Sequence, residues 1–270
     1  MSALYLAAAK AAGVKVLISH SHNAGESGAI KKLMTKALCP LLNHVATLRL
    51  ACGREAGEHL FHGYPYKVFP NAIDLDSFRY DKSRADAIRK ALGFGEKDVI
   101  IGHVGRFEHQ KNHDFLAKVL QQLYKRNPQI RFLLIGTGSL EEKIRGQFRD
   151  YGIENVVTIL KHRTDIPDLL QAMDLIVFPS HYEGFSIAMV EMQAAGLRIL
   201  ASDCIPQEIN ITGNVAFKSL NDTPEQWAET ALSMLNYNRG SAAISKLADY
   251  GLDINESVKR LENIFLALGN

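Results

Sequence analysis

The chain has 270 residues, a hydrophobic fraction of 47% and a formal net charge of +2 at pH 7. This length allows one large domain or two of ordinary size, and the apolar fraction is ample for a globular core. A charge so near zero gives no footprint for nucleic-acid binding, and no segment reaches the roughly 20 apolar residues of a membrane-spanning helix. The cysteines, Cys39, Cys52 and Cys204, show neither metal-ligand spacing nor a pairing pattern. They indicate a reducing compartment, so we expect a cytoplasmic protein.

The first 80 residues alternate helices and strands. We expect helices at 3–12, 25–43 and 53–61, and strands at 14–19, 46–51 and 66–69. Residues 1–80 hold nine basic and five acidic side chains, a net charge of +4. The helix at 25–43 places Lys31, Lys32 and Lys36 among apolar residues, namely Leu33, Met34, Leu38, Leu41 and Leu42. Two interpretations stay open for it: contact with an anionic membrane surface, or a core helix with a solvated basic face.

From residue 81 onward the alternation is more regular. A charged helix at 83–92 is followed by strands at 98–104, 131–135, 155–159, 174–178, 198–201 and 214–217. The helices expected between and after them lie at 112–126, 139–152, 166–173, 223–236, 240–249 and 255–268, with one more after residue 183. Such alternation favours parallel sheets covered on both faces. We predict an α/β protein with a first domain at 1–80, a second at 81–250 and a C-terminal helix at 251–270 that packs back toward the first.

Two glutamates lie in the segment from Ser180 to Gly196, directly after the buried-strand pattern at 175–178. Glu183 falls in a glycine-bearing turn and Glu191 more than one turn into the following helix. A strand, a turn and a helix in this order direct backbone N–H groups and the positive helix dipole toward a ligand above the sheet. Carboxylates accept hydrogen bonds, so the pair suits a polyhydroxylated ligand that also carries an anion. The alternative is a solvated helix with two surface acids.

A second polar segment follows the strand at 98–104. It contains Gly105, Arg106 and Lys111, and Lys111 lies near the start of the next helix. Arginine offers a planar fork and lysine a compact charge, so this pair beside a helix N-terminus predicts a diphosphate site. The alternative is an ordinary surface arginine and lysine.

Together with Val68–Phe78, these segments resemble the retaining glycosyltransferases of family four, which have the GT-B fold of two Rossmann-like, doubly wound domains. Gly105-Arg106-x-x-x-Gln110-Lys111 is similar to the family's phosphate-binding segment, and Pro70–Asp74 to its interdomain turn. The opening, Ala9–Asn23, looks like the branch that builds bacterial capsule and exopolysaccharide. Only three strands precede residue 80, so the resemblance implies that the N-terminal domain is incomplete and lacks its first part.

The resemblance also implies roles for the charged residues. Arg106 and Lys111 would hold the diphosphate beside Gly105 and stabilise charge on the leaving group. Glu191 would accept hydrogen bonds from the ribose hydroxyls, and Glu183 would contact hydroxyls of the donor sugar. The backbone N–H groups that would face the sugar or the phosphate are those of Gly184, Phe185 and Ser186.

Four other positions are implied less directly. Arg163, in the loop Lys161–Asp165, would lie over the nucleotide base, or the loop is purely structural. The resemblance places a histidine close to the sugar and the scissile bond, and His22 matches it better than His20. A histidine there would donate to sugar hydroxyls or share in handling the acceptor proton, unless it is structural. The remaining histidines of the phosphate segment, His103, His109 and His113, are interpreted as structural or phosphate-proximal.

Two further motifs are interpreted as incidental. Asp74-Leu-Asp76 has the spacing of metal-dependent transferases but lies in a turn far from Arg106 and Lys111, so we predict no metal site. Gly136-Thr-Gly138 follows a strand, yet Glu141 stands where a nicotinamide-binding loop needs its third glycine.

The predicted activity is metal-independent, retaining transfer of a sugar from a nucleotide diphosphate sugar, a UDP-linked donor, to a saccharide or lipid-linked acceptor in cell-surface polysaccharide synthesis. No cofactor beyond this substrate is expected, and peripheral contact with the inner face of the cell membrane fits the basic helix. Two alternatives remain. One is a donor-binding subunit that needs a partner chain or self-association, and the other is a nucleotide-sugar epimerase of the same architecture.

Overall fold

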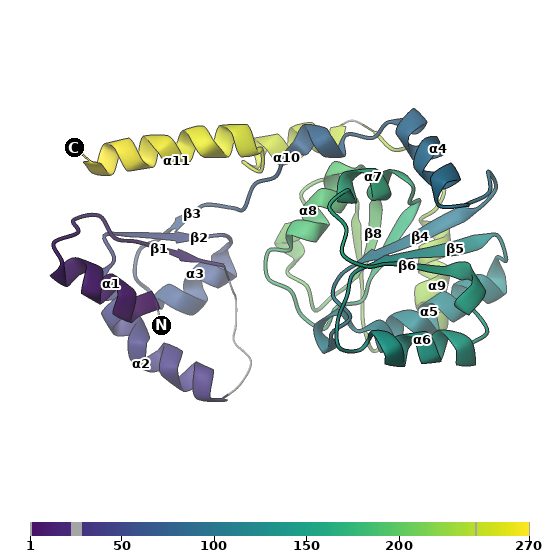
Figure 1. Ribbon diagram of the computed structural model, residues 1–270, viewed down its shortest axis with the longest axis horizontal. Helices are drawn as coiled ribbons and strands as arrows, with labels where there is room; N and C mark the ends of the chain where they lie inside the picture. The colour runs from purple at the N-terminus through teal and green to yellow at the C-terminus, as the bar shows by residue number, and fades with distance from the viewer. Residues whose placement is uncertain (1, 23–28, 241, 270) are drawn as a thin grey trace. The chain divides into compact units, whose positions relative to one another are not determined.

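The computed structural model describes residues 2–22, 29–240 and 242–269 (Figure 1). It divides into two compact units, Met1–Ala72 with Ile254–Asn270, and Ile73–Asp253. The elements follow the predicted alternation of helix and strand almost throughout, and the α/β fold class is confirmed.

The first unit has a parallel sheet in the order β1-β2-β3. Its strands are β1 (Ile18–Ser21), β2 (Leu48–Ala51) and β3 (Lys67–Val68), and its helices are α1 (Ser2–Ala11), α2 (Ala29–Val45), α3 (Arg54–Phe61) and α11 (Ile254–Gly269). Its buried core includes a cluster of Ala3, Leu42, Ala51 and Phe61. The strand predicted at 14–19 begins only at Ile18, because its partner strand begins at Leu48 and offers residues 14–16 nothing to pair with.

The second unit is a six-stranded parallel sheet in the order β6-β5-β4-β7-β8-β9. The strands are β4 (Val99–Val104), β5 (Ile130–Ile135), β6 (Val157–Leu160), β7 (Leu175–Phe178), β8 (Arg198–Ser202) and β9 (Val215–Lys218). The helices are α4 (Lys82–Ala91), α5 (His113–Arg126), α6 (Glu141–Asp150), α7 (Ile166–Gln171), α8 (Ile187–Ala194), α9 (Pro224–Ser233) and α10 (Ala242–Asp249).

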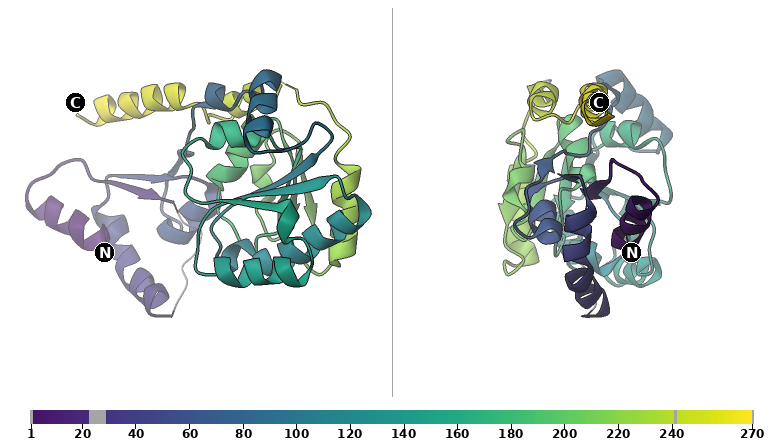
Figure 2. Two further views of the ribbon diagram at one scale, coloured as in Figure 1. Left: turned by 45° about the vertical axis from the view of Figure 1, so that its right-hand side comes forward. Right: turned by 90° about the vertical axis from the view of Figure 1, so that its left-hand side faces the viewer.

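Helices cover both faces of this sheet (Figures 1 and 2). One face carries a buried cluster that includes Leu116, Phe148 and Trp227, and the other a cluster that includes Phe178 and Met189. The central strands are therefore apolar on both sides, and all four residues of β7 are buried. The chain starts at β4, runs outward to β6 and then returns to β7, so the order reverses between β4 and β7. Open α/β sheets bind ligands outside the carboxyl ends of the strands at such a point.

The boundaries of the units differ from the predicted ones at residues 80 and 250. The short 3₁₀ helix η1 (Leu75–Phe78) buries Leu75 and Phe78 in the core of the second unit. The backbone N–H of Ile73 also donates to the carbonyl of Leu252 at 3.0 Å. Residues 73–80 and 251–253 thus belong to the second unit, because their apolar side chains and backbone partners lie there.

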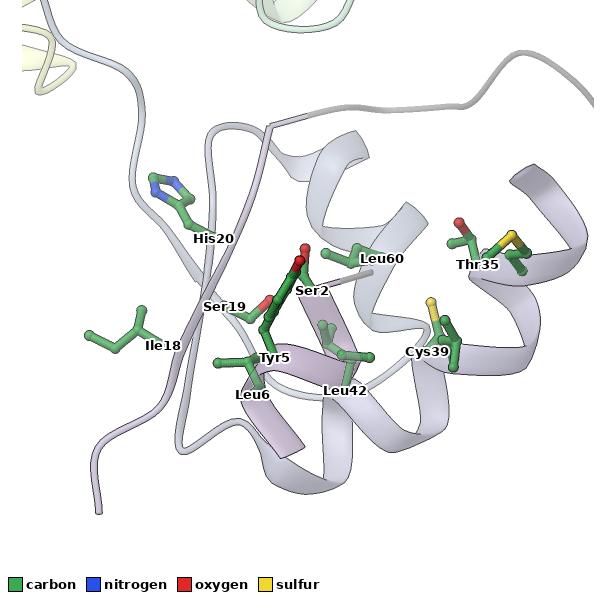
Figure 3. A pocket seen from close by; sticks show the side chains of 13 residues that line it. Ser2, Tyr5, Leu6, Ile18, Ser19, His20, Thr35, Cys39, Leu42 and Leu60 are labelled. Atoms are coloured by element: carbon green, nitrogen blue, oxygen red, sulfur yellow. The ribbon is translucent and has the colours of Figure 1, made fainter. Parts of the chain in front are cut away.

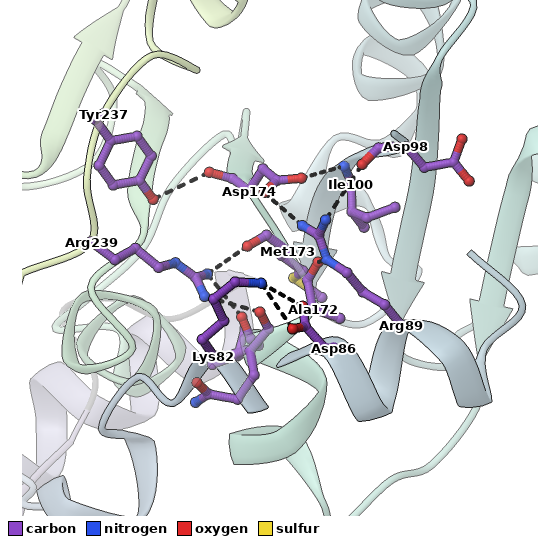
Figure 4. Close-up of polar contacts among 12 residues, drawn as sticks. Lys82, Asp86, Arg89, Asp98, Ile100, Ala172, Met173, Asp174, Tyr237 and Arg239 are labelled. Atoms are coloured by element: carbon purple, nitrogen blue, oxygen red, sulfur yellow. Dashed lines mark hydrogen bonds and ion pairs between the residues drawn. The ribbon is translucent and has the colours of Figure 1, made fainter. Parts of the chain in front are cut away.

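Charged side chains tie α4 and the segment after α9 to the end of α7 (Figure 4). The Arg239 guanidinium donates to the carbonyls of Leu170, Gln171 and Met173. Arg89 pairs with Asp174 at 2.6 Å, and the other oxygen of Asp174 accepts from the N–H of Ile100 at 2.7 Å. Cations at a helix C-terminus satisfy its open carbonyls, so this network fixes the end of α7 beside β4.

Candidate functional site

Two loops at the reversal point carry most of the predicted site residues. We call residues 105–112, after β4, the cation loop, and residues 179–186, after β7, the glutamate loop. The cation loop lies against the loop that follows β5 so closely that two glycines are required. A Cβ at Gly136, where φ is +154°, would lie 2.0 Å from the Gly105 carbonyl oxygen, and one at Gly138 would lie 2.3 Å from that of Phe107.

The cation loop is also anchored by Glu108. Its carboxylate accepts from the N–H and the hydroxyl of Ser139, both at 3.0 Å, and these bonds lower the pKa of Glu108. Gly105 leaves room for the lysine stem, since an added Cβ would lie 3.0 Å from Cδ of Lys111. The start of α5 is thereby held beside the carboxyl end of β4.

Lys111 and Glu183 form an ion pair that joins the two loops. The Nζ to Oε1 distance is 2.7 Å, and the two side chains are only 13% and 7% exposed. The ammonium also lies 4.5 Å from the centroid of the Phe178 ring. Charges held this far from water are costly unless they are paired, and here each of the two charges compensates the other.

The N-terminus of α8 is open. The consecutive backbone N–H groups of residues 184–188 find no acceptor in the described part of the chain, and the hydroxyl of Ser186 at the N-cap makes no capping bond. A Cβ added at Gly184 would meet no atom of the described residues within 4 Å. Unpaired N–H groups at the positive end of a helix form an anion-binding site. The predicted row of Gly184, Phe185 and Ser186 begins one residue after Glu183.

Glu191 is half-buried on α8, and its carboxylate has no hydrogen-bond partner among the described residues. Burial raises its pKa from 4.5 to about 7. A desolvated and unpartnered carboxyl group beside an open helix end suits a ligand hydroxyl, because that contact would replace the water it has lost.

Arg106 and Arg163 differ in how they are held. Arg106 is exposed and its guanidinium makes no hydrogen bond in the ranges that the structure describes, so it can reach an anion. Arg163 donates twice to its near neighbour Asp165, at 2.7 and 2.5 Å. A stacking role over a base would require Arg163 to leave or share this pair.

Two buried histidines lie close to Lys111, and from the sequence they were interpreted as structural or phosphate-proximal. His103 donates from Nδ1 to the Val177 carbonyl at 2.9 Å. His113 is 1% exposed and stacks on Phe107 at 4.3 Å, and neither of its ring nitrogens has a partner among the residues that the structure describes. Burial lowers the pKa of His113 to about 4 and that of His103 well below its usual range, so both rings are neutral at physiological pH.

His22 and His20 lie in the first unit. His22 is exposed directly after β1, and its ring centroid lies 4.1 Å from that of His20. The ring of His20 donates to the Phe69 carbonyl at 3.3 Å and lines a pocket of about 390 Å³ formed by α1, β1, α2 and α3 (Figure 3). Asn23, at the end of the resembling opening, lies outside the described residues, as do the side chains of Lys31 and Lys32.

The aspartates of the incidental motif lie at the start of η1. Asp74 precedes η1, and Asp76 pairs with Arg79 at 2.7 Å. Across residues 2–22, 29–240 and 242–269, no cluster of three or more His, Cys, Asp or Glu side chains has the arrangement of a metal site. In the same ranges, no helix combines the length and apolar character needed to cross a membrane.

Sequence reasoning missed the contacts of Gln110 and Phe178. Both residues lie in segments that the sequence singles out. A periodic pattern of apolar residues, however, does not reveal the cation–π contact of Phe178 with Lys111. Nor does it reveal the hydrogen bond of Gln110 to a loop about 70 residues away. The position of Phe178 as the last residue of a buried strand was the one available signal.

The fold and these loops define an α/β protein of the GT-B glycosyltransferase class, and comparison with solved structures agrees. The structure matches that of Anabaena Alr3699/HepE in complex with UDP with a TM-score of 0.83 and 20% identity, covering 98% of this chain and 76% of that one. It matches WaaG, a glycosyltransferase involved in lipopolysaccharide biosynthesis, with a TM-score of 0.72 and 16% identity, covering 95% and 79% of the two chains.

Sequence comparison gives the family. Residues 84–248 match the model of the glycosyl transferases group 1, and the chain belongs to this family. It is 33% identical to EpsF of Bacillus subtilis over 269 residues, which cover 96% of this chain and 70% of that protein. It is 31% identical over 150 residues to the Escherichia coli UDP-Gal:alpha-D-GlcNAc-diphosphoundecaprenol alpha-1,3-galactosyltransferase, covering 54% of this chain and 37% of that one.

Proposed function

We propose that this protein transfers a sugar, with retention of configuration, from a nucleoside diphosphate sugar to a saccharide or lipid-linked acceptor in cell-surface polysaccharide synthesis. The observation that carries the proposal is the row of unpaired N–H groups at the start of α8, directly beside the Lys111–Glu183 pair. These groups converge on the place where an open α/β sheet binds its ligand.

In this proposal the diphosphate is held by Lys111, Arg106 and the open N–H groups of α8. Preorganised cations and dipoles stabilise the charge that develops on the leaving phosphate, and removing one such group typically costs a factor of about 100–1000 in rate. With these charges in place, the reaction needs no divalent metal. The acceptor hydroxyl attacks from the face that the nucleotide leaves, and a phosphate oxygen takes its proton.

The two glutamates bind the rest of the donor. Glu191 accepts from the ribose hydroxyls, for which its unpartnered carboxyl group is suited. Glu183 accepts from hydroxyls of the sugar. Because Lys111 pairs with Glu183, an arriving diphosphate shares or takes over the ammonium and leaves the carboxylate available to the sugar. His22 would donate to sugar hydroxyls or assist the acceptor proton, and Arg163 would cover the base.

We propose that the donor nucleotide carries uracil as its base. Solved structures of Anabaena Alr3699/HepE contain UDP and UDP-glucose, and the Escherichia coli relative is named for UDP-Gal. The place in cell-surface polysaccharide synthesis rests on the likeness to EpsF and to WaaG.

A peripheral contact with an anionic membrane fits α2. Leu33 and Met34 are 70% and 48% exposed there, and Lys36 is exposed close by. Apolar side chains beside basic ones bind the surface of anionic bilayers. Co-sedimentation with vesicles that contain anionic lipid tests this contact. Equal recovery of the protein with neutral and anionic vesicles would exclude it.

Thermal melting with UDP, GDP and ADP, each without metal, tests the donor site. A ligand at 100 times its dissociation constant stabilises its protein by about 2.7 kcal/mol, which is roughly 5–10 °C for a unit of this size. We expect UDP to produce this shift and Glu191→Ala to abolish it. A folded wild-type protein that responds to none of the three nucleotides would refute the proposal. Product analysis with labelled donor then separates transfer from epimerisation or binding alone.

A further inference from the structure

The cation loop and the glutamate loop meet at Gln110. Its side-chain amide donates from Nε2 to the carbonyl oxygen of Tyr182 at 3.0 Å. The backbone carbonyl oxygen of Gln110 accepts from the backbone N–H of His181 at 2.8 Å. One residue thus bonds the two loops twice, through its side chain and through its backbone.

The contacts on either side of Gln110 run in the same direction along both loops. The His109 and His181 rings stack with centroids 4.6 Å apart and planes 18° from parallel. Lys111 pairs with Glu183 two positions further along. Residues 109–111 therefore face residues 181–183 in order, and the two loops are aligned residue by residue.

This alignment fixes where the cation stands relative to the open helix end. Lys111 is covalently next to Gln110, and the row of unpaired N–H groups begins at Gly184, two residues beyond Tyr182. In the proposed donor site, Lys111 and these N–H groups must reach oxygens of the same diphosphate. A displacement of about 1 Å in such a constellation is enough to lose much of its effect.

We infer that Gln110 is a positioning residue for the donor site, which sets the separation between Lys111 and the N-terminus of α8 without touching the donor itself. The inference rests on the proposed function. The backbone bond from His181 would survive a change of the Gln110 side chain, whereas the bond to Tyr182 would not. A side-chain substitution therefore loosens the alignment without removing it.

UDP titration calorimetry on the full chain, without metal, tests this inference. The variants are Gln110→Met, which keeps the length of the side chain but cannot donate, and Gln110→Glu, which sets an acceptor against the Tyr182 carbonyl. Gln121→Met on α5 is the matched control, because Gln121 is half-buried and its side chain has no hydrogen bond among the described residues. We expect Gln110→Met to weaken UDP binding about 3- to 10-fold, Gln110→Glu by at least as much, and the control by less than twofold.

A double-mutant cycle with Lys111→Met separates positioning from mere structural support. If Gln110 acts through Lys111, adding Gln110→Met to Lys111→Met costs less than a further twofold. Fully additive losses, or unchanged UDP affinity in both Gln110 variants while the wild type binds, would overturn the inference and leave the proposed function standing. Failure of the wild type to bind any nucleotide would refute both the inference and the proposed function. If Gln110→Met does not fold, the same comparison is made with Gln110→Glu, because a glutamate side chain is readily hydrated at this partly exposed position.

Discussion

At the scale of single residues, the Lys111–Glu183 pair has two roles that compete. Within the ligand-free protein each charge compensates the other, while in the proposed reaction the ammonium serves a diphosphate and the carboxylate serves a sugar. Its buried position makes the competition measurable, because a poorly solvated ammonium without its carboxylate binds an arriving anion more strongly.

We therefore predict that Glu183→Gln lowers the stability of the ligand-free protein by about 2–4 kcal/mol and raises its affinity for UDP severalfold. Sugar transfer should fall by about 100-fold or more, since the carboxylate contact to the donor sugar is lost. Chemical denaturation and calorimetric titration with UDP give the two quantities. Glu191→Gln is the control, for which UDP affinity should fall; a parallel fall in Glu183→Gln would contradict the exchange of partners by Lys111.

Glu191 gives a prediction about pH. Its pKa is raised from 4.5 to about 7 in the folded protein, because burial disfavours the ionised form. The neutral carboxyl group therefore favours the folded state below about pH 4.5, and this contribution is lost as the pH rises through 7. Relative to Glu191→Gln, the wild type should lose on the order of 2 kcal/mol of unfolding free energy between pH 4.5 and 7.5, allowing for partial exposure. Urea denaturation of both proteins at the two pH values measures this difference, and parallel pH profiles would contradict it.

The sequence identified the residue types of the candidate site but not which of them touch. Glu183 and Lys111 were both predicted to face the donor, yet their mutual ion pair joins positions 72 residues apart. Periodicity reports which side of an element is buried, and it carries no information on which loop lies beside which. The neutral state of the two buried histidines could not be predicted for the same reason, because it follows from their packing against Phe107 and Phe178.

At the scale of elements, the prediction was far more complete. Almost every helix and strand lies within a few residues of its expected position, because each strand of the second unit is a short apolar run between amphipathic helices. The misplaced boundary at residue 80 shows what such patterns omit. The turn at 73–78 has no periodicity of its own, and it is assigned to the second unit by the burial of Leu75 and Phe78 and by the backbone bond of Ile73 to Leu252.

Two glycines of the second unit, Gly138 beside the cation loop and Gly146 inside α6, provide element-scale predictions of opposite sign. A Cβ at Gly138 would lie 2.3 Å from the Phe107 carbonyl oxygen, so Gly138→Ala must push the loop after β5 away from the cation loop. We expect a loss of roughly 2–3 kcal/mol in unfolding free energy and weaker UDP binding. Gly146→Ala is the matched control, because Gly146 lies inside α6 with only the end of the Arg149 side chain nearby, at 3.8 Å. The Gly146→Ala variant should gain about 0.5–1 kcal/mol of unfolding free energy. Urea denaturation compares the two, and equal effects would refute the close-packing argument.

At the scale of the whole molecule, the two units have cores of very different size. The first buries a cluster of Ala3, Leu42, Ala51 and Phe61, whereas the second has two large clusters, one on each face of its sheet. Buried apolar area is the main source of folding stability, so the units should differ in stability and need not unfold together.

We predict two calorimetric transitions, the lower one belonging to Met1–Ala72 with Ile254–Asn270 and the upper one to Ile73–Asp253. Since the proposed diphosphate groups all lie in the second unit, UDP at 100 times its dissociation constant should raise the upper transition by roughly 5–10 °C. Phe61→Ala supplies the assignment, because Phe61 is fully buried in the first core and its loss should lower only the first transition. A single transition that UDP and Phe61→Ala both shift would mean that the units unfold as one. In that case nucleotide binding would stabilise the entire chain, and the stability of the first unit would depend on the occupancy of the donor site.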